Sequence, residues 1–306
     1  MHTWGRFVFQ EKLMTSKEFK SIDEQIKILE SRGLNIPEKE TAKDFLLKNN
    51  YYRISGYSLT LRKNDIFYKN ATFQNIMDIY HFDHELRHIL LKYIEMIEVH
   101  IKSVFAYEFT KQHGAAGYLD PKYFTDINQH KIILDNANKQ KNKRLPHEAY
   151  LKHFICDLKQ DIPLWAFVDL LTIADISFLY SISEDTIKDA VAAEFGLKVK
   201  SASKILSNHL HSMTIIRNLC AHGSRLYNRL FEQKPSINKQ EKKLLRTGKD
   251  GTIDNAHLYG FVIIMRKLLP PRDFAEMKEG ILQLCRQYPF VRMDYYGFRS
   301  DWKTAL

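Results

Sequence analysis

Cysteine is scarce in this chain, with three residues among 306, at positions 156, 220 and 285. An odd number of widely separated cysteines supplies neither a disulfide framework nor a thiolate metal cluster, so we expect a reducing compartment. Long apolar runs are also missing, because the longest clean run, Phe261 to Met265, is far shorter than the roughly 20 residues that cross a bilayer. The start, Met1 to Gln10, has a lone Arg6 and no extended apolar stretch. These absences predict a cytoplasmic protein with no membrane partner and no signal peptide.

The glycine motifs of common nucleotide and hydrolase sites are absent as well. The sequence contains no Gly-x-x-x-x-Gly-Lys-Ser/Thr, no Gly-x-Gly-x-x-Gly and no Gly-x-Ser-x-Gly. Nucleotide hydrolysis, dinucleotide binding and serine hydrolysis at a strand-to-helix turn therefore lack their usual signatures.

The chain is rich in hydrophobic residues and carries a net positive charge. A hydrophobic content of 44% predicts a well-filled core, in one large domain or two ordinary ones. Forty-six Lys and Arg against thirty-six Asp and Glu give a net charge of +10. This excess favours a polyanionic partner such as nucleic acid over an anionic membrane surface.

Apolar residues recur at helical spacing through most of the chain, which predicts an all-α fold. From Thr72 to Gly114 the spacing indicates one long amphipathic helix, or two joined by a kink. We expect residues 1–75 to form a helical hairpin followed by an aromatic turn at Tyr51–Tyr57, and residues 76–306 to form a helical bundle. The further helices expected cover 16–32, 38–48, 124–137, 147–158, 163–180, 183–195, 257–269 and 271–288.

Two basic stretches are candidate RNA contacts. Lys139, Lys141, Lys143 and Arg144 form a run that either contacts a phosphate backbone or is a solvated helix surface, the commoner case. Arg53 lies among tyrosines that can stack on bases, although packing of the hairpin explains those tyrosines more simply.

The segment His84-Glu85-Leu86-Arg87-His88 matches the zinc-hydrolase pattern His-Glu-x-x-His on an expected helix. That pattern places two imidazoles on one helix face for zinc, with the glutamate as general base. A catalytic site needs a third protein ligand, and no downstream motif supplies one. A zinc-dependent hydrolase using His84 and His88 is therefore a remote alternative.

The strongest candidate site is the polar end of an apolar helix, where Arg217, Asn218 and His222 follow one another closely. A permanent cation and an imidazole that titrates near neutrality are what metal-independent RNA cleavage needs. The 2′-hydroxyl must lose a proton, the phosphorane needs positive charge, and the 5′-oxygen must gain a proton. The structural alternative is a helix C-terminal pair that interacts with the last carbonyls and the macrodipole.

Helix geometry adds a constraint to this site. At about 100° per residue, Asn218 and His222 share a face, whereas Arg217 and His222 are about 140° apart. A straight helix cannot present Arg217 and His222 to one substrate. Either the helix distorts at Gly223, or two copies of the motif meet in a symmetric dimer.

Several short stretches carry a resemblance to a known family. They are Asn50–Tyr57, Tyr80–Asp83 with Leu86-Arg87 and Leu90, Ile94–Val99, Pro163–Trp165 with Leu171-Thr172, Ser177 and Tyr180, and Arg217–His222 with Arg225-Leu226 and Asn228-Arg229. In this order they resemble the Abi-like abortive infection family of bacterial phage-defence proteins (AbiD/AbiF type). The Arg-Asn-x-x-x-His signature is similar to that of the HEPN superfamily of helical ribonucleases. His84 and His88 are not positions of this resemblance.

The resemblance implies a HEPN-type helical bundle and an endoribonuclease toxin that works without a metal or cofactor and leaves 2′,3′-cyclic phosphates. It implies that His222 is the general base or acid, that Arg217 stabilises the phosphorane, and that Asn218 orients the phosphate or the imidazole. Arg225, Asn228 and Arg229 then contact the RNA backbone or hold the helix. It also implies a restraining partner, a small structured RNA acting as antitoxin or as a guide-like cofactor. The helix geometry, in turn, favours a homodimer through the Arg217–His222 helix. A non-catalytic RNA-binding module on the same fold is the rival interpretation.

Overall fold

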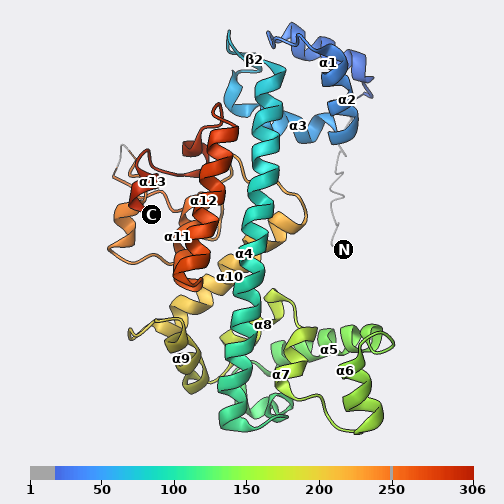
Figure 1. The fold of residues 1–306 in the computed structure, drawn as a ribbon, viewed down its shortest axis with the longest axis vertical. Coiled ribbons are helices and arrows are strands. Elements are labelled where there is room, and N and C mark those ends of the chain that lie inside the picture. The colour runs from blue at the N-terminus through green and yellow to red at the C-terminus, as the bar shows by residue number, and fades with distance from the viewer. Residues whose placement is uncertain (1–17, 249–250) are drawn as a thin grey trace, which may run out of the picture. The chain divides into compact units, whose positions relative to one another are not determined.

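The protein is described by a computed structural model that covers residues 18–248 and 251–306, and its fold is all-α (Figure 1). The helices are α1 (Ile22–Ser31), α2 (Lys39–Asn49), α3 (Tyr51–Tyr57), α4 (Phe73–His113), α5 (Ile127–Arg144), α6 (Ala149–Lys152), α7 (Leu164–Phe167), α8 (Ile173–Ile182), α9 (Asp185–Glu194), α10 (Ala202–Ala221), α11 (Leu258–Leu268), α12 (Pro271–Gln287) and α13 (Trp302–Ala305). In the described residues, β1 (Arg62–Lys63) and β2 (Ile66–Phe67) form the one sheet, an antiparallel hairpin. The chain divides into two compact units, residues 1–76 and 77–306.

The first unit contains the expected helical hairpin, α1 and α2. Ser21 caps α1 with a capping box shared with Glu24, so the helix begins later than the predicted range 16–32, and Phe19 precedes it and is exposed. The aromatic turn predicted at Tyr51–Tyr57 is wrong, because these residues form α3. Asn50 adopts a positive φ of 65° and its side chain accepts a hydrogen bond from the Tyr52 N–H, which starts a new helix.

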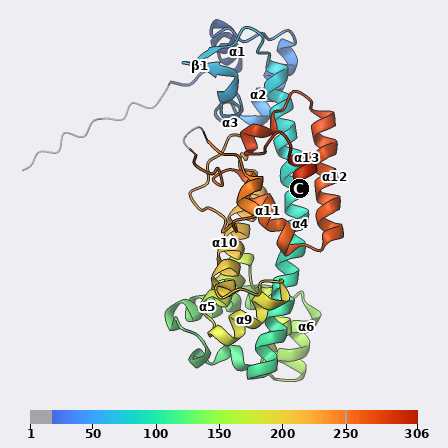
Figure 2. The ribbon, with the colours of Figure 1, turned by 90° about the vertical axis from the view of Figure 1, so that its left-hand side faces the viewer.

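Of the two possibilities expected from Thr72 to Gly114, one long helix or two joined by a kink, the structure has one long helix, α4. Thr72 and Asn75 exchange side-chain to backbone hydrogen bonds at its start, and Gly114, with a φ of +77°, ends it. Its fully buried residues recur every three or four positions and include Phe82, Leu86, Leu90, Ile94, Ile97, Ile101 and Phe105. Helix α12 lies beside α4 in two views (Figures 1 and 2). Gly280 of α12 packs against Ile89 of α4, because a Cβ on Gly280 would meet Ile89 Cδ1 at 3.4 Å.

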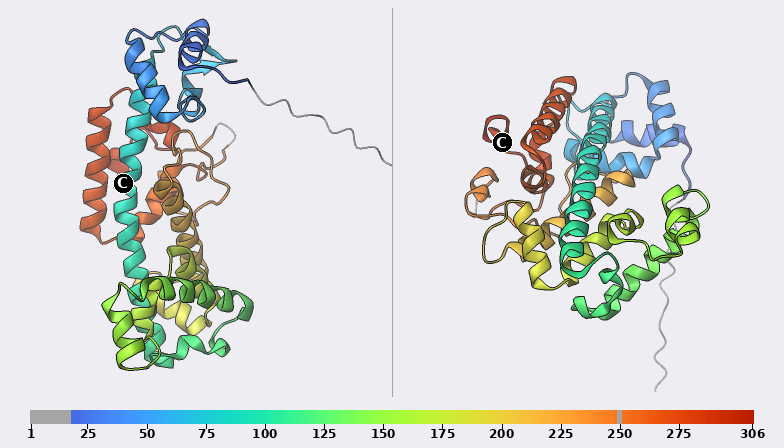
Figure 3. Two further views of the ribbon diagram at one scale, coloured as in Figure 1. Left: turned by 90° about the vertical axis from the view of Figure 1, so that its right-hand side faces the viewer. Right: turned by 60° about the horizontal axis from the view of Figure 1, so that its bottom comes forward.

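Helix α10 packs against α8, α9 and α11 in the second unit (Figure 3). The single helix predicted over 163–180 is wrong. Thr172 adopts an extended conformation and caps a new helix through Asp175, so α7 and α8 are separate elements. None of the helices described is long and apolar enough to cross a membrane.

Candidate ribonuclease site at the end of helix α10

The candidate site begins where α10 ends. The buried residues Leu206, Leu210, Met213 and Ile216 anchor one face of the helix in the core. His222 caps the helix, and Gly223 takes the left-handed conformation with a φ of +62°. The Gly223 N–H donates to the Cys220 carbonyl at 3.1 Å and the Ser224 N–H to the Leu219 carbonyl at 2.8 Å, a Schellman motif. The helix is thus regular up to Ala221. At Gly223 it ends and does not bend.

Two predicted catalytic side chains face solvent at this end. Asn218 and His222 are both exposed, and neither side chain has a hydrogen bond or ion pair with residues 18–248 or 251–306. His211 is exposed as well, and its separation of seven positions from Asn218 places the two within about 20° on the helix. These three side chains, here called the exposed face of α10, are available to an external ligand.

Arg217 points to a different side of α10, toward α4. Its Nε lies 4.0 Å from a Glu98 carboxylate oxygen, and its side chain is 37% exposed. Glu98 also accepts a hydrogen bond from Lys102 Nζ at 2.8 Å, so the carboxylate is held between two cations. Within one chain, Arg217 and His222 therefore face in different directions, as the helical spacing predicts.

A groove follows α4 from Arg217. The pocket at Arg217, of about 370 Å³, includes Val99 and Lys102 in its wall. The same two residues line a larger pocket of about 590 Å³ that reaches Tyr107 and Trp165. Val99, Tyr107 and Trp165 are each more than half exposed, and Lys111 Nζ lies 5.9 Å from the Tyr107 ring centroid. Exposed aromatic rings beside lysines are the side chains on which single-stranded nucleic acid stacks.

A buried ion pair anchors the segment that follows His222. Asp83 and Arg87, one turn apart on α4, are 0% and 2% exposed and are joined by a hydrogen bond. Asp83 also accepts from the Leu226 and Tyr227 N–H groups at 3.2 and 2.8 Å, and from the Tyr296 hydroxyl at 2.9 Å. The Arg87 guanidinium reaches the Ser224 carbonyl at 3.5 Å. This pair fixes the loop after α10 to α4, and with it the position of His222.

Cys220 lies inside the motif and behind the exposed face. Its side chain is buried, and desolvation raises the pKa of the thiol to about 12, against a smaller opposing effect of Arg87. A thiol of such high pKa is not a nucleophile near neutral pH. Cys220 is thus a packing residue.

The residues after the helix are partly engaged in local contacts. Arg225 Nη1 donates to the Tyr227 carbonyl at 2.5 Å, and Arg229 Nη1 to the Arg225 carbonyl at 3.3 Å. Asn228 adopts a positive φ of 49°, which asparagine tolerates. Arg229 also lines a cleft of about 630 Å³ beside the exposed face, together with His211 and Leu219. Of the three, Arg229 has the clearest access to a ligand at this cleft.

The other predicted RNA contacts lie elsewhere. Lys139 and Lys143 are exposed on the last two turns of α5, and Lys141 lines a separate pocket. Arg144 donates to the Asp169 carbonyl at 2.8 Å and to Glu148 at 3.0 Å, and this second bond raises its pKa. Arg53 is exposed on α3, in the first unit.

Sequence reasoning gave no structural role to Asp83, Arg87 or Glu98. The signal was present for the first two, because an Asp and an Arg four residues apart fall on the apolar stripe of α4, where charges occur only when paired. His211 was also missed, although its spacing from Asn218 places it on the same face. No local pattern reveals the contact of Tyr296 with Asp83, which spans 213 positions.

Comparison with known proteins gives one relationship. No curated protein and no solved structure matches the chain. The sequence model of the Abi-like protein family matches residues 44–228, a stretch that includes α4, α10, the Asp83–Arg87 pair and the Arg217–His222 motif. Because this match covers more than half of the 306 residues, the protein belongs to the Abi-like protein family.

Proposed function

We propose that this protein is a metal-independent endoribonuclease of the HEPN type that acts in abortive infection, the defence to which its family membership points. The observation that carries the proposal is the end of α10. Asn218 and His222 face solvent there without intramolecular polar partners among the described residues, on a helix end fixed by the buried Asp83–Arg87 pair. The fixed helix end presents two side chains that are free to engage a phosphate or a ribose hydroxyl from outside the chain.

The chemistry assigned to these residues is intramolecular transesterification. His222 removes the proton of a ribose 2′-hydroxyl, whose oxygen attacks the adjacent phosphorus, and the bond from phosphorus to the 5′-oxygen breaks. Arg217 balances the negative charge of the phosphorane, and Asn218 orients the phosphate. The leaving 5′-oxygen takes up a proton from a second imidazole or from water. The products are a 2′,3′-cyclic phosphate and a 5′-hydroxyl.

The active site is shared by two copies of the chain in this proposal. Arg217 turns toward Glu98 while His222 lies about 140° around the helix, so one chain does not present both to one phosphate. A two-fold axis beside the exposed face of α10 brings the motifs of both copies into one cleft. Ala221 is exposed and small enough to allow close approach of the helices.

The groove along α4 is the assigned path for the RNA strand. It starts at Arg217 and carries exposed Tyr107 and Trp165, and the net charge of +10 favours a polyanion. A small structured RNA that restrains the nuclease is the partner proposed for the basic surface of α5.

The test compares the wild type with Arg217→Ala and His222→Ala on unstructured RNA in the presence of EDTA. We expect cleavage by the wild type alone, with cyclic phosphate ends, and equal RNA binding by all three proteins. If none of the three cleaves and all bind RNA equally, the protein is the rival RNA-binding module. Relief of toxicity on expression by His222→Ala is the cellular form of the same test.

A further inference from the structure

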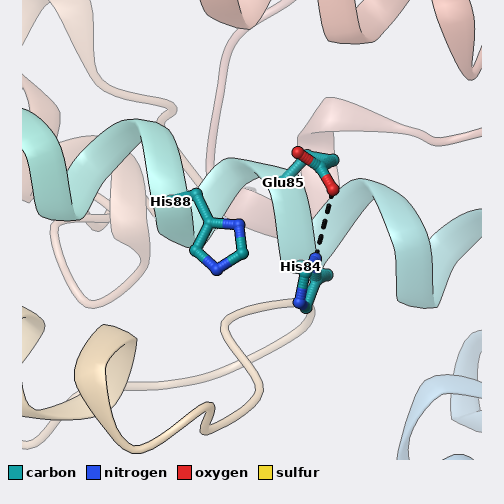
Figure 4. Close-up of side chains that lie close together, drawn as sticks. All are labelled: His84, Glu85 and His88. Atoms are coloured by element: carbon teal, nitrogen blue, oxygen red, sulfur yellow. Dashed lines mark hydrogen bonds and ion pairs between the residues drawn. The ribbon is translucent and has the colours of Figure 1, made fainter.

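Three potential metal ligands converge on the solvent-accessible surface of α4, about one turn before Leu91, which lines the pocket at Arg217. His84, Glu85 and His88 each offer one donor atom, and these atoms all lie within 4.8 Å of one another (Figure 4). His84 Nδ1 lies 3.2 Å from a Glu85 carboxylate oxygen, and the His84 and His88 ring centroids are 4.3 Å apart. The Tyr80 ring stacks on His84 at 6.5 Å. All three side chains are reachable from solvent.

The spacing follows from the helix itself. Residues four apart on an α-helix lie one above the other, so His84 and His88 present their rings to the same point outside the helix. Donors around a tetrahedral zinc ion, at bonds of 2.0 to 2.2 Å, are separated by roughly 3 to 4 Å. Small rotations of exposed side chains bring the present donors to that separation.

We propose that His84, Glu85 and His88 bind one divalent transition-metal ion, with zinc as the ion that best fits. Two imidazole nitrogens and one carboxylate oxygen are borderline donors that suit Zn²⁺, whereas Mg²⁺ and Ca²⁺ prefer sites made of oxygen alone. The fourth position is open to water or to a ligand from outside the chain. The proposal concerns a bound ion and assigns it no part in RNA cleavage.

An ion at this site would affect the stability of the fold, because its ligands lie next to Asp83 and Arg87, the two residues that hold the loop after α10. Asp83 and Arg87, which hold Leu226, Tyr227 and Ser224, belong to the same turn of α4 as the three ligands. An ion that links His84 to His88 stabilises this turn only in its helical state. Zinc therefore stabilises the folded protein, since an ion bound by the native state alone shifts the folding equilibrium.

Zinc binding to the full chain, stripped with EDTA and free of any histidine tag, tests the proposal. Titration with ZnCl₂ is expected to give one ion per chain and a rise in the melting temperature. His88→Ala should weaken binding by at least about tenfold and remove the rise. His100→Ala is the matched control, because His100 is another exposed histidine of α4, twelve positions farther on. Millimolar Mg²⁺ should not displace the zinc.

The result is independent of the proposed nuclease, whose test contains EDTA and leaves this site without its ion. Equal zinc binding by the wild type and His88→Ala overturns the proposal. An equal loss of zinc affinity in His88→Ala and His100→Ala also overturns it. Circular dichroism of His88→Ala without metal shows whether the variant is folded, and a folded variant that keeps the zinc-induced rise in melting temperature also refutes the site.

Discussion

At the scale of single residues, the chemistry of the motif depends on which groups are desolvated. Cys220 lies between Asn218 and His222 in sequence, yet burial raises its pKa to about 12. Cys156 is exposed, and Cys285 is half-buried. We expect a thiol reagent at pH 8 to modify Cys156 first and Cys220 only on unfolding, as followed by mass spectrometry of the native protein.

The variant Cys220→Ala should retain RNA cleavage. A loss of cleavage in this variant would mean that the thiol has a role in the site.

His209, on the buried face of α10, makes stability depend on pH. Its Nε2 donates to the Ser236 carbonyl at 2.8 Å, while its buried Nδ1 has no partner among the described residues, an arrangement that only the neutral ring satisfies. Burial lowers its pKa to about 4 from 6.5. The unfolded chain binds more protons between these values, so this contribution is complete above pH 6.5 and is lost as the pH falls toward 4.

The free energy of unfolding should therefore decrease by about 3 kcal/mol from pH 7 to pH 4 through His209 alone. Urea titrations of the wild type and His209→Gln at several pH values measure this contribution as a difference between the two proteins. Glutamine retains a donor near the Nε2 position but does not titrate. Identical pH profiles for the two proteins would contradict the assignment of a neutral buried imidazole.

At the scale of elements, the junction between α4 and the loop after α10 depends on one ion pair. Asp83→Asn removes the charge that balances Arg87 in a fully buried setting, which typically costs about 3 to 5 kcal/mol. We expect a large fall in melting temperature, and weaker RNA cleavage below that melting temperature because the position of His222 is no longer fixed.

An exposed pair of the same spacing is the control for this substitution. Lys48 and Asp44 are four residues apart on α2, joined at 2.7 Å, with both side chains more than half exposed. Asp44→Asn should change stability by less than about 1 kcal/mol, because solvent screens such pairs. If the two variants lose similar stability by calorimetry, burial is not what makes Asp83 important.

The groove along α4 predicts a separate effect on RNA affinity. Trp165→Ala, made in the His222→Ala background to prevent cleavage, should weaken binding of single-stranded RNA by about 1 to 3 kcal/mol, the usual value of one stacked base. Phe178→Ala is the control, because Phe178 is a similarly exposed aromatic residue of α8 that does not line the groove. Fluorescence anisotropy at fixed salt measures both, and equal affinities would remove the groove from the RNA path.

Helical periodicity was enough to predict the extent of α4, though not the absence of a kink, and the buried face of α10, because both are long and strongly patterned. The errors lie where one polar side chain decides the local structure. Asn50, with its positive φ, starts α3 through one capping hydrogen bond, and Thr172 separates α7 from α8 through a capping box with Asp175. The sequence motif supplied the candidate residues of the site but not the groups that hold them, since Asp83, Glu98 and Tyr296 reach it from distant parts of the chain.

At the scale of the whole molecule, the proposed mechanism depends on the oligomeric state, because Arg217 and His222 of one chain point in different directions. One chain turns Arg217 toward Glu98 and His222 toward solvent, so the proposed site is completed by a second chain. Light scattering should then give twice the mass of one 36.1 kDa chain for the active protein. A strictly monomeric active enzyme would mean that Arg217 and His222 of one chain meet after a rearrangement.

Mixing two inactive proteins tests the shared site most directly. Arg217→Ala and His222→Ala are each expected to lose RNA cleavage by about 10²-fold or more. In a mixed dimer, the arginine of one chain and the histidine of the other remain, so a shared cleft recovers part of the activity. Native mass spectrometry of the mixture establishes that subunits have exchanged. Subunit exchange without any recovery of activity would show that each chain needs its own Arg217 and His222. The end of α10 would then have to bend to bring these two side chains of one chain to the same phosphate.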